Sequence, residues 1–229
     1  MKKFKKALVL FLCAVLLVAG SVAGTLAYLQ AKSDVVQNTF TIGDVQIDLD
    51  EADVNEYGVK LNENRVKANE YKLLPGHSYI KDPTVTVKAD SEESYIRMFV
   101  TINKQAELDA IFTAINAERA GKGLDALTIA DVLTGFDNAI WTRYAEVENT
   151  DNTRTYEFRY YKTVSTVDAG DMRLEPLFTK IEMPGEITNA QLKTLYAADA
   201  TKDLKIDVVA EAIQADGFDT ADKAWAQWK

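Results

Sequence analysis

The sequence predicts a mainly β fold, an antiparallel β-sandwich that carries a helical insertion and a short C-terminal helix. Many short segments alternate apolar with polar residues, which is typical of half-buried strands. Gly, Pro, Asn and Asp residues separate these segments, as in sheets whose strands are joined by tight turns. Helical periodicity is confined to the insertion at about 104–139, to a stretch near 188–196 and to the C-terminal end. This separation of helices from strands favours an antiparallel sandwich.

The N-terminal residues have the pattern of a secretory signal peptide. Four lysines within the first six residues precede an apolar run from Ala7 to Leu29. Thr25 and Ala27 supply the small residues that a signal peptidase requires, so we predict cleavage between Ala27 and Tyr28, with Ala23 as an earlier alternative. The domains expected are therefore a signal peptide at 1–27 and a single sandwich domain at 28–229.

An uncleaved membrane anchor is the alternative reading of the same apolar run, which is long enough to span a bilayer. The second half of the run, residues 19–25, is rich in small residues, and this composition favours cleavage. Lipid attachment at Cys13 is not expected because Leu12 stands where a lipoprotein signal needs a small residue. We therefore expect membrane contact only through the uncleaved signal.

Charge and cysteine content exclude several classes of partner and site. The formal net charge is −9, and removal of the signal lysines makes the remaining chain more acidic. Such a surface repels nucleic acid and anionic lipid. Because Cys13 is the only cysteine, the mature chain has no disulfide, and its rigidity must come from packing and strand pairing.

The first half of the mature chain contains the clearest strands. Alternation from Phe40 to Leu49, with a phase slip at residues 43–44, predicts a strand pair or a bulged strand. Acidic, turn-rich sequence at residues 50–58 is expected to end it. Pro75-Gly76 predicts a type II turn. Two further strands follow, at residues 84–88 and 95–102, and the second is apolar enough to lie in the core.

The second half begins with the helical insertion and then returns to strands. Leu108, Ile111, Phe112 and Ile115 share one helical face, and a second helical piece is expected from Thr128 to Phe136. Thr188 and Gln191 form the pattern of a capping box. The remaining expected elements are strands at 141–148, 153–164, 174–183 and 204–213, a hairpin turn at 149–152, a helix at 188–196, and a C-terminal helix containing Trp225 and Trp228.

Several passages, in this order along the chain, resemble the TasA and camelysin (CalY) family of exported Gram-positive proteins. The resembling passages are residues 24–29, residues 38–43, Leu74-Pro75-Gly76 leading to Lys81-Asp82-Pro83, Ser94-Tyr95-Ile96-Arg97, and residues 210–218. The resemblance implies a jelly-roll-like sandwich and processing by a SipW-type signal peptidase. It also implies a secreted structural protein of the extracellular biofilm matrix that assembles into fibres.

In that family the segment behind the cleavage site leaves its own subunit and completes the sheet of the next, which is donor-strand exchange. Carried to this sequence, the donor segment is Tyr28 to Phe40, with Tyr28, Leu29, Val35, Val36 and Phe40 as its apolar residues. An unpaired sheet edge accepts such a segment through main-chain hydrogen bonds. The helical insertion departs from the family's best-known fibre former. A non-polymerising cell-surface adhesin or an accessory matrix protein is therefore the alternative.

Camelysin-type proteins have been described as metallopeptidases, but the residues do not favour an enzyme. A zincin helix needs two histidines four residues apart, and this chain has only His77. A Ser-His-Asp triad would have to use the same His77, which follows the Pro75-Gly76 turn and is expected to face solvent. We expect no catalytic, cofactor-binding or metal-binding residue, although a pair of carboxylates is a matter of spatial separation that sequence leaves open.

Two surface stretches have alternative interpretations. The acidic run at residues 48–53 could bind calcium, but it lacks the glycine and distal glutamate of an EF-hand loop, which favours a solvated turn. The run of Tyr and Thr residues at 153–166 could form a carbohydrate-facing surface, and cross-strand packing explains it equally well.

Overall fold

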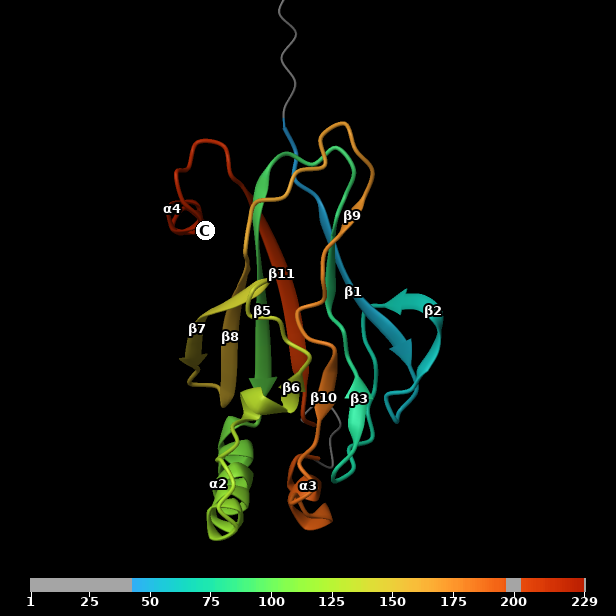
Figure 1. Cartoon of the computed structure of the whole chain (residues 1–229), viewed down its shortest axis with the longest axis vertical. Helices are drawn as coiled ribbons and strands as arrows, with labels where there is room; N and C mark the ends of the chain where they lie inside the picture. Colours follow the sequence, from blue (N-terminus) through green and yellow to red (C-terminus); the bar gives the residue numbers. More distant parts are fainter. Residues whose placement is uncertain (1–42, 197–202, 229) are drawn as a thin grey trace, which may run out of the picture. The chain divides into compact units, whose positions relative to one another are not determined.

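The computed structural model describes residues 43–196 and 203–228, and their strands form three antiparallel sheets (Figure 1). The first sheet has the order β2-β1-β4-β9, made of Lys60–Val66, Ile47–Val54, Thr84–Val87 and Met172–Arg173. The second has the order β3-β10-β6, made of Ser78–Ile80, Lys180–Glu182 and Leu133–Thr134. The third has the order β11-β5-β8-β7, made of Ile206–Gln214, Ser94–Asn103, Thr153–Tyr160 and Trp141–Glu148.

Helices are few and lie outside the sheets. The helical segments are α2 at Gln105–Gly121, the 3-10 turn η1 at Ile129–Val132, α3 at Asn189–Thr194 and α4 at Ala221–Trp225. In Figure 1, α2 and α3 lie at the same end of the strands. The prediction of a mainly antiparallel β fold with a helical insertion and a short C-terminal helix is thus confirmed. Within 43–196 and 203–228, no helix has both the length and the apolarity to cross a membrane.

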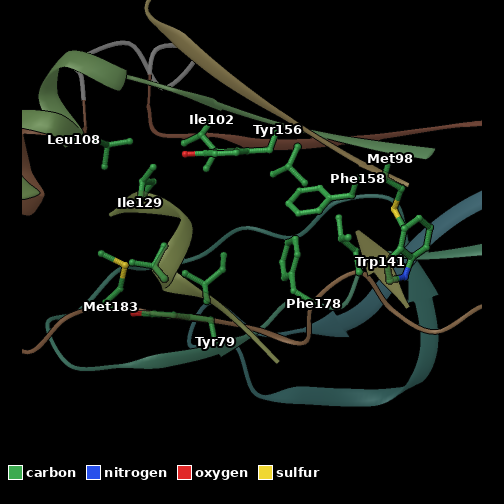
Figure 2. Close-up of a cluster of buried hydrophobic side chains, with 14 of the residues drawn as sticks. Tyr79, Met98, Ile102, Leu108, Ile129, Trp141, Tyr156, Phe158, Phe178 and Met183 are labelled. Atoms are coloured by element: carbon green, nitrogen blue, oxygen red, sulfur yellow. The ribbon is translucent and has the colours of Figure 1, made fainter. Parts of the chain in front are cut away.

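A single apolar core joins the three sheets. Alternate residues of β5 are buried, from Ser94 through Ile102, as a strand with one face on a core requires. Val85 and Val87 of β4 belong to the same buried cluster, as does Ile181 of β10. Figure 2 shows this cluster, in which Trp141 and Met98 lie toward one end and Leu108 and Met183 toward the other.

Helix α2 closes one part of this core with the face that its sequence predicts. Leu108, Ile111, Phe112 and Ile115 are the buried residues of the helix. They recur at the three- and four-residue spacing of one helical face. The second helical piece is shorter than predicted: η1 ends at Val132, and Leu133–Thr134 forms β6 against β10. Tertiary pairing with β10 therefore overrides the helical pattern at residues 133–136.

The strand predicted at residues 174–183 is wrong in its extent. Only β9, at Met172–Arg173, and β10, at Lys180–Glu182, are strands, and the chain between them is irregular. Pro176 lies in this interval and cannot donate a ladder hydrogen bond. Leu174 N donates to Val85 O and Thr179 N donates to Thr134 O, so the irregular stretch carries the chain from one sheet to the next.

The acidic turn predicted at residues 50–58 is confirmed only at residues 55–58, because β1 continues through the acids to Val54. The carboxylates do not force a turn, since cations from neighbouring strands neutralise them: Arg65 pairs with Asp50, and Lys81 with Glu51. Strand β2, which supplies Arg65, was not predicted, because its sequence KLNENRV is polar and largely exposed.

Three local turn and cap predictions are confirmed. His77 N donates to Leu74 O across Pro75-Gly76, and Gly76 has φ of 68°, as the second central position of a type II turn requires. Residues 149–152 join β7 to β8 as a hairpin. Thr188 and Gln191 form the reciprocal capping box at the start of α3.

The core should depend strongly on Trp141, which has no exposed surface and donates through Nε1 to Glu175 O at 3.0 Å. We expect Trp141→Ala to lower the free energy of unfolding by about 3–5 kcal/mol, because it leaves a large cavity and an unpaired carbonyl. Chemical denaturation measures this change. Trp228→Ala is the matched control, because Trp228 is 44% exposed, and it should cost about 1 kcal/mol or less. Equal losses in the two variants would contradict this account of the core.

Candidate functional site

The described residues form a groove between β1 and β11, with a cavity volume of about 1010 Å³. Leu49, Asp50 and Glu51 of β1 line one side, and residues 206–209 of β11 line the other. The segment at 66–73 forms a further wall. Strand β1 also lies adjacent to β11 in the fold. The groove is therefore a seam between the first and third sheets.

Both strands at this seam have a sheet edge without a strand partner. Strand β11 is the terminal strand of its sheet and pairs with β5 alone among the described residues. Strand β1 pairs with β4 over Ile47–Asp50, but it pairs with β2 only from Glu51 onward. Half of β1 is therefore also paired on one side only. In a strand, every second backbone amide points away from a given neighbour, so both edges present donors and acceptors to the seam.

Side chains beneath the seam are apolar and incompletely covered. Four alternate residues of β11 pack against the core yet are only half-buried, namely Ile206, Val208, Ala210 and Ala212. The matching residues of its neighbour β5 are fully buried. Ile102, Leu108, Ile129 and Met183, which lie at one end of the cluster in Figure 2, also line the groove. The seam is thus a place where the core reaches the surface.

Val66 pairs with Glu51 of β1, and beyond it two hydroxyl groups help to hold the wall at 66–73 in place. Tyr71 donates its hydroxyl to Ile80 O at 3.0 Å, and Leu73 N donates to the hydroxyl of Tyr196 at 3.2 Å. Burial raises the pKa of the Tyr71 phenol, and the carboxylates of Glu51 and Asp82 add to the shift. Tyr71 therefore stays protonated and keeps its donor role across the neutral range.

Arg65 fastens the base of this wall to β1. Its Nε donates to Asp50 Oδ1 at 2.8 Å, and its Nη1 donates to Asp82 Oδ2 at 2.5 Å. Its Nη2 donates to Thr84 Oγ1 at 3.0 Å. Burial acts to lower the pKa of Arg65, but the hydrogen bonds to Asp82 and Asp50 outweigh it and raise the pKa. Arg65 is therefore a permanent cation that links β2, β1 and the start of β4.

Glu51 and Lys81 form a second ion pair beside the groove, and both are buried. Lys81 Nζ lies 2.6 Å from Glu51 Oε2. The other carboxylate oxygen, Oε1, accepts from Asn69 Nδ2 at 2.8 Å. Lys81 Nζ also lies 5.9 Å from the centre of the Tyr71 ring. These contacts join the wall at 66–73 to β1 through one carboxylate.

His77 lies in the predicted turn, but it is half-buried rather than fully exposed to solvent. Its Nε2 forms a 2.9 Å hydrogen bond with Tyr57 O, and its ring packs edge-on against Tyr79 at 4.6 Å between centres. These contacts give His77 a structural role in fixing the turn against the β1–β2 connection. Among residues 43–196 and 203–228, no group of three or more His, Cys, Asp or Glu side chains is arranged to hold a metal ion.

The acidic run at residues 48–53 lies in β1 and is not a loop. Asp48 pairs with Lys67, and the hydrogen bond from Lys67 lowers the pKa of Asp48. Asp50 accepts from two arginines, Arg65 and Arg173. Asp53 accepts from Asn62 Nδ2 at 2.8 Å. Each carboxylate thus faces a protein donor, and the solvated turn that the sequence favoured is replaced by a paired strand.

The residues predicted from sequence to carry the function lie outside the described residues. These are the cleavage pair Ala27 and Tyr28 and the donor residues Leu29, Val35, Val36 and Phe40. The structure instead shows the groove, which sequence reasoning did not find. The sequence does contain one indication of the groove. The inward-facing residues of β11 include Ala210 and Ala212, whose small side chains cover less of the core than the Ile, Met and Val residues of β5.

Comparisons with known proteins do not identify the chain. No family model, no curated protein and no solved structure matches it. The groove, the strand edges beside it and the sequence are therefore the basis for a proposed function.

Proposed function

We propose that this chain is a secreted structural protein of the TasA and camelysin type, which assembles into extracellular matrix fibres by donor-strand exchange. The observation that carries the proposal is the groove between β1 and β11, which has an apolar floor and facing strand edges that no described strand pairs. Such a groove is the acceptor that donor-strand exchange requires, because a sheet edge supplies main-chain hydrogen bonds and an apolar floor supplies side-chain contacts.

We further propose that the three sheets build a jelly-roll-like sandwich. Face-to-face burial supports this reading, because Val85 and Val87 of β4 share one core with Ile96, Met98 and Val100 of β5. Sheets whose inner faces interdigitate in this way are typical of sandwiches. The edges of β1 and β11 that face the groove then mark the side on which the described part of the chain can accept a further strand.

The donor in this proposal is the segment from Tyr28 to Phe40 of a neighbouring copy. It exceeds the nine residues of β11 in length, so it can span that edge. Tyr28, Val36 and Phe40 fall on one face of an extended chain, whereas Leu29 and Val35 fall on the other. In this proposal the face that carries Val36 and Phe40 contacts the floor of the groove.

Signal removal acts as the switch for assembly in this account. Cleavage between Ala27 and Tyr28 frees the N-terminus, and only a free end can enter the groove of another copy. Export through a signal peptidase places the mature chain outside a Gram-positive cell. Self-association is then the principal interaction, and no cofactor is needed for it, because backbone pairing and apolar burial supply the affinity.

The first test removes the donor. Deletion of residues 28–37 from the mature chain should abolish fibres while leaving a folded monomer, because the acceptor domain remains intact. Electron microscopy detects the fibres, and size-exclusion chromatography with circular dichroism detects the folded monomer. Fibres as abundant as those of the complete mature chain would refute the donor role.

The second test supplies the donor separately. A synthetic peptide with the sequence of residues 28–40 should bind the truncated protein saturably in calorimetry and should cap fibre growth. A peptide of the same composition in scrambled order is the control, because it loses the spacing of Val36 and Phe40 along the strand. Equal binding of both peptides would indicate non-specific adsorption instead of strand addition.

The third test blocks the acceptor. Val208 of β11 packs toward the core and lines the groove, whereas Val147 of β7 is 52% exposed and is not one of the groove residues. We expect Val208→Arg to prevent fibre formation and peptide binding, because the long cation occupies the groove. Val147→Arg is the control and should assemble normally. Thermal melting checks that both variants fold, and assembly by folded Val208→Arg protein would contradict the groove assignment.

A non-polymerising adhesin is the second candidate, and one observation favours it. The outer face of the third sheet exposes Tyr144, Val147 and Val209, each more than half exposed. Exposed apolar and aromatic groups on a flat sheet suit contact with a partner surface. Size-exclusion chromatography of the mature chain separates the two proposals, since an adhesin stays monomeric at concentrations where a fibre former assembles.

A further inference from the structure

Three side chains beside the groove bring an amine and a carboxamide to the same carboxylate. Lys81 supplies an amine, Asn69 supplies a carboxamide, and Glu51 binds both through its two carboxylate oxygens. Lys81 Nζ lies 2.6 Å from Oε2, and Asn69 Nδ2 lies 2.8 Å from Oε1. We propose that Lys81 and Asn69 form an intramolecular isopeptide bond, with Glu51 as the proton-transfer group. This proposal is independent of fibre assembly.

The burial of the pair supports amine chemistry over a purely structural ion pair. Lys81 is 8% exposed and Glu51 is 5% exposed. Desolvation makes two charges in such a site costly. Attack on a carbonyl carbon requires the lone pair of the amine, and Glu51 is the group placed to accept the proton that Lys81 gives up in that step. The ring of Tyr71, 5.9 Å from Nζ, adds an apolar neighbour on another side.

The carboxamide of Asn69 is held as an electrophile. Its Oδ1 accepts from Val54 N at 3.1 Å, and its Nδ2 donates to Ala52 O at 2.9 Å as well as to Glu51. A backbone N–H on the carbonyl oxygen stabilises the negative charge that develops there when the carbon is attacked. Glu51 contacts the leaving nitrogen, so the group that takes a proton from the amine can deliver one to the amide.

The reaction balances without any co-reactant. Glu51 takes one proton from the Lys81 ammonium, and Nζ then attacks Cγ of Asn69, so that a new C–N bond forms and a tetrahedral intermediate carries negative charge on Oδ1. Glu51 gives this proton to Nδ2 and takes a second proton from the attacking nitrogen. The Cγ–Nδ2 bond then breaks, and Nδ2 leaves as ammonia, which takes the second proton from Glu51 and becomes ammonium. Glu51 returns to its starting carboxylate, and no atom is oxidised or reduced.

The bond would fasten the wall of the groove. Asn69 lies in the segment at 66–73, and Lys81 follows β3, so the link closes a covalent ring around the Pro75-Gly76 turn. Without cysteine in the mature chain, a disulfide cannot serve this purpose. Ring closure restricts the unfolded chain in the same way as a disulfide does.

The decisive measurement is the intact mass of the purified, denatured mature chain. We expect it to be lower than the sequence mass by one ammonia, and a protease digest should contain a branched peptide that joins residue 69 to residue 81. Chain kept in denaturant from the moment of lysis should retain the full mass and lose ammonia only after refolding. The unmodified sequence mass in folded protein, or an ammonia loss without the branched peptide, would overturn the proposal.

Variants assign the roles. Lys81→Arg removes the amine, Asn69→Ala removes the carboxamide, and Glu51→Gln removes the proton-transfer group, so each should keep the sequence mass calculated for it. Lys67→Arg is the matched control, because Lys67 pairs with Asp48 nearby but outside the cluster, and it should still lose ammonia. Cross-linking that persists in folded Glu51→Gln protein would overturn the role of Glu51. If a variant fails to fold, the wild-type mass still decides the question.

Discussion

The facing edges of β1 and β11 impose the constraint on which the rest of the structure depends. Backbone groups at a strand edge need partners, and apolar side chains beneath it need cover. Strand β11 has one strand partner among the described residues, and the first half of β1 has one as well. The core beneath them is complete at Trp141 and Tyr156 but only half-covered at Ile206 and Val208. A further strand at this seam would satisfy the backbone and the core together.

Polar residues keep the seam open in the described domain. Arg65 binds Asp50 and Asp82, and Glu51 joins Lys81 to Asn69, so the wall at 66–73 is anchored to β1 by side chains. Buried ion pairs add little net stability, because desolvation opposes their attraction, but they favour one arrangement over others. The proposed isopeptide bond would make that arrangement covalent. A rigid wall suits an acceptor, because a preformed groove loses less conformational entropy when it binds a strand.

Local sequence patterns predicted the elements that depend on local chemistry. The alternation of β5, the apolar face of α2 and the Thr188–Gln191 cap each follow from neighbouring residues. The wrong predictions concern segments whose structure depends on long-range pairing. Arg65 neutralises Asp50, which allows the acidic run to form strand β1, and pairing with β10 makes residues 133–134 a strand in place of the predicted helix. The groove was missed for the same reason. The sequences of β5 and β11 show the same alternation of inward and outward residues. The sequence alone therefore does not reveal that β5 is a central strand and β11 an edge strand.

Hydrogen exchange of the β11 backbone tests the central claim most directly. In the monomer, amides of Ile206–Gln214 that point away from β5 should exchange quickly, because no strand within residues 43–196 or 203–228 pairs with that edge. In assembled fibres the same amides should become strongly protected, while the outer edges of β2 and β7 should not change. Protection that appears at β2 or β7 with β11 unchanged would contradict the account, as would full protection of β11 in the isolated monomer.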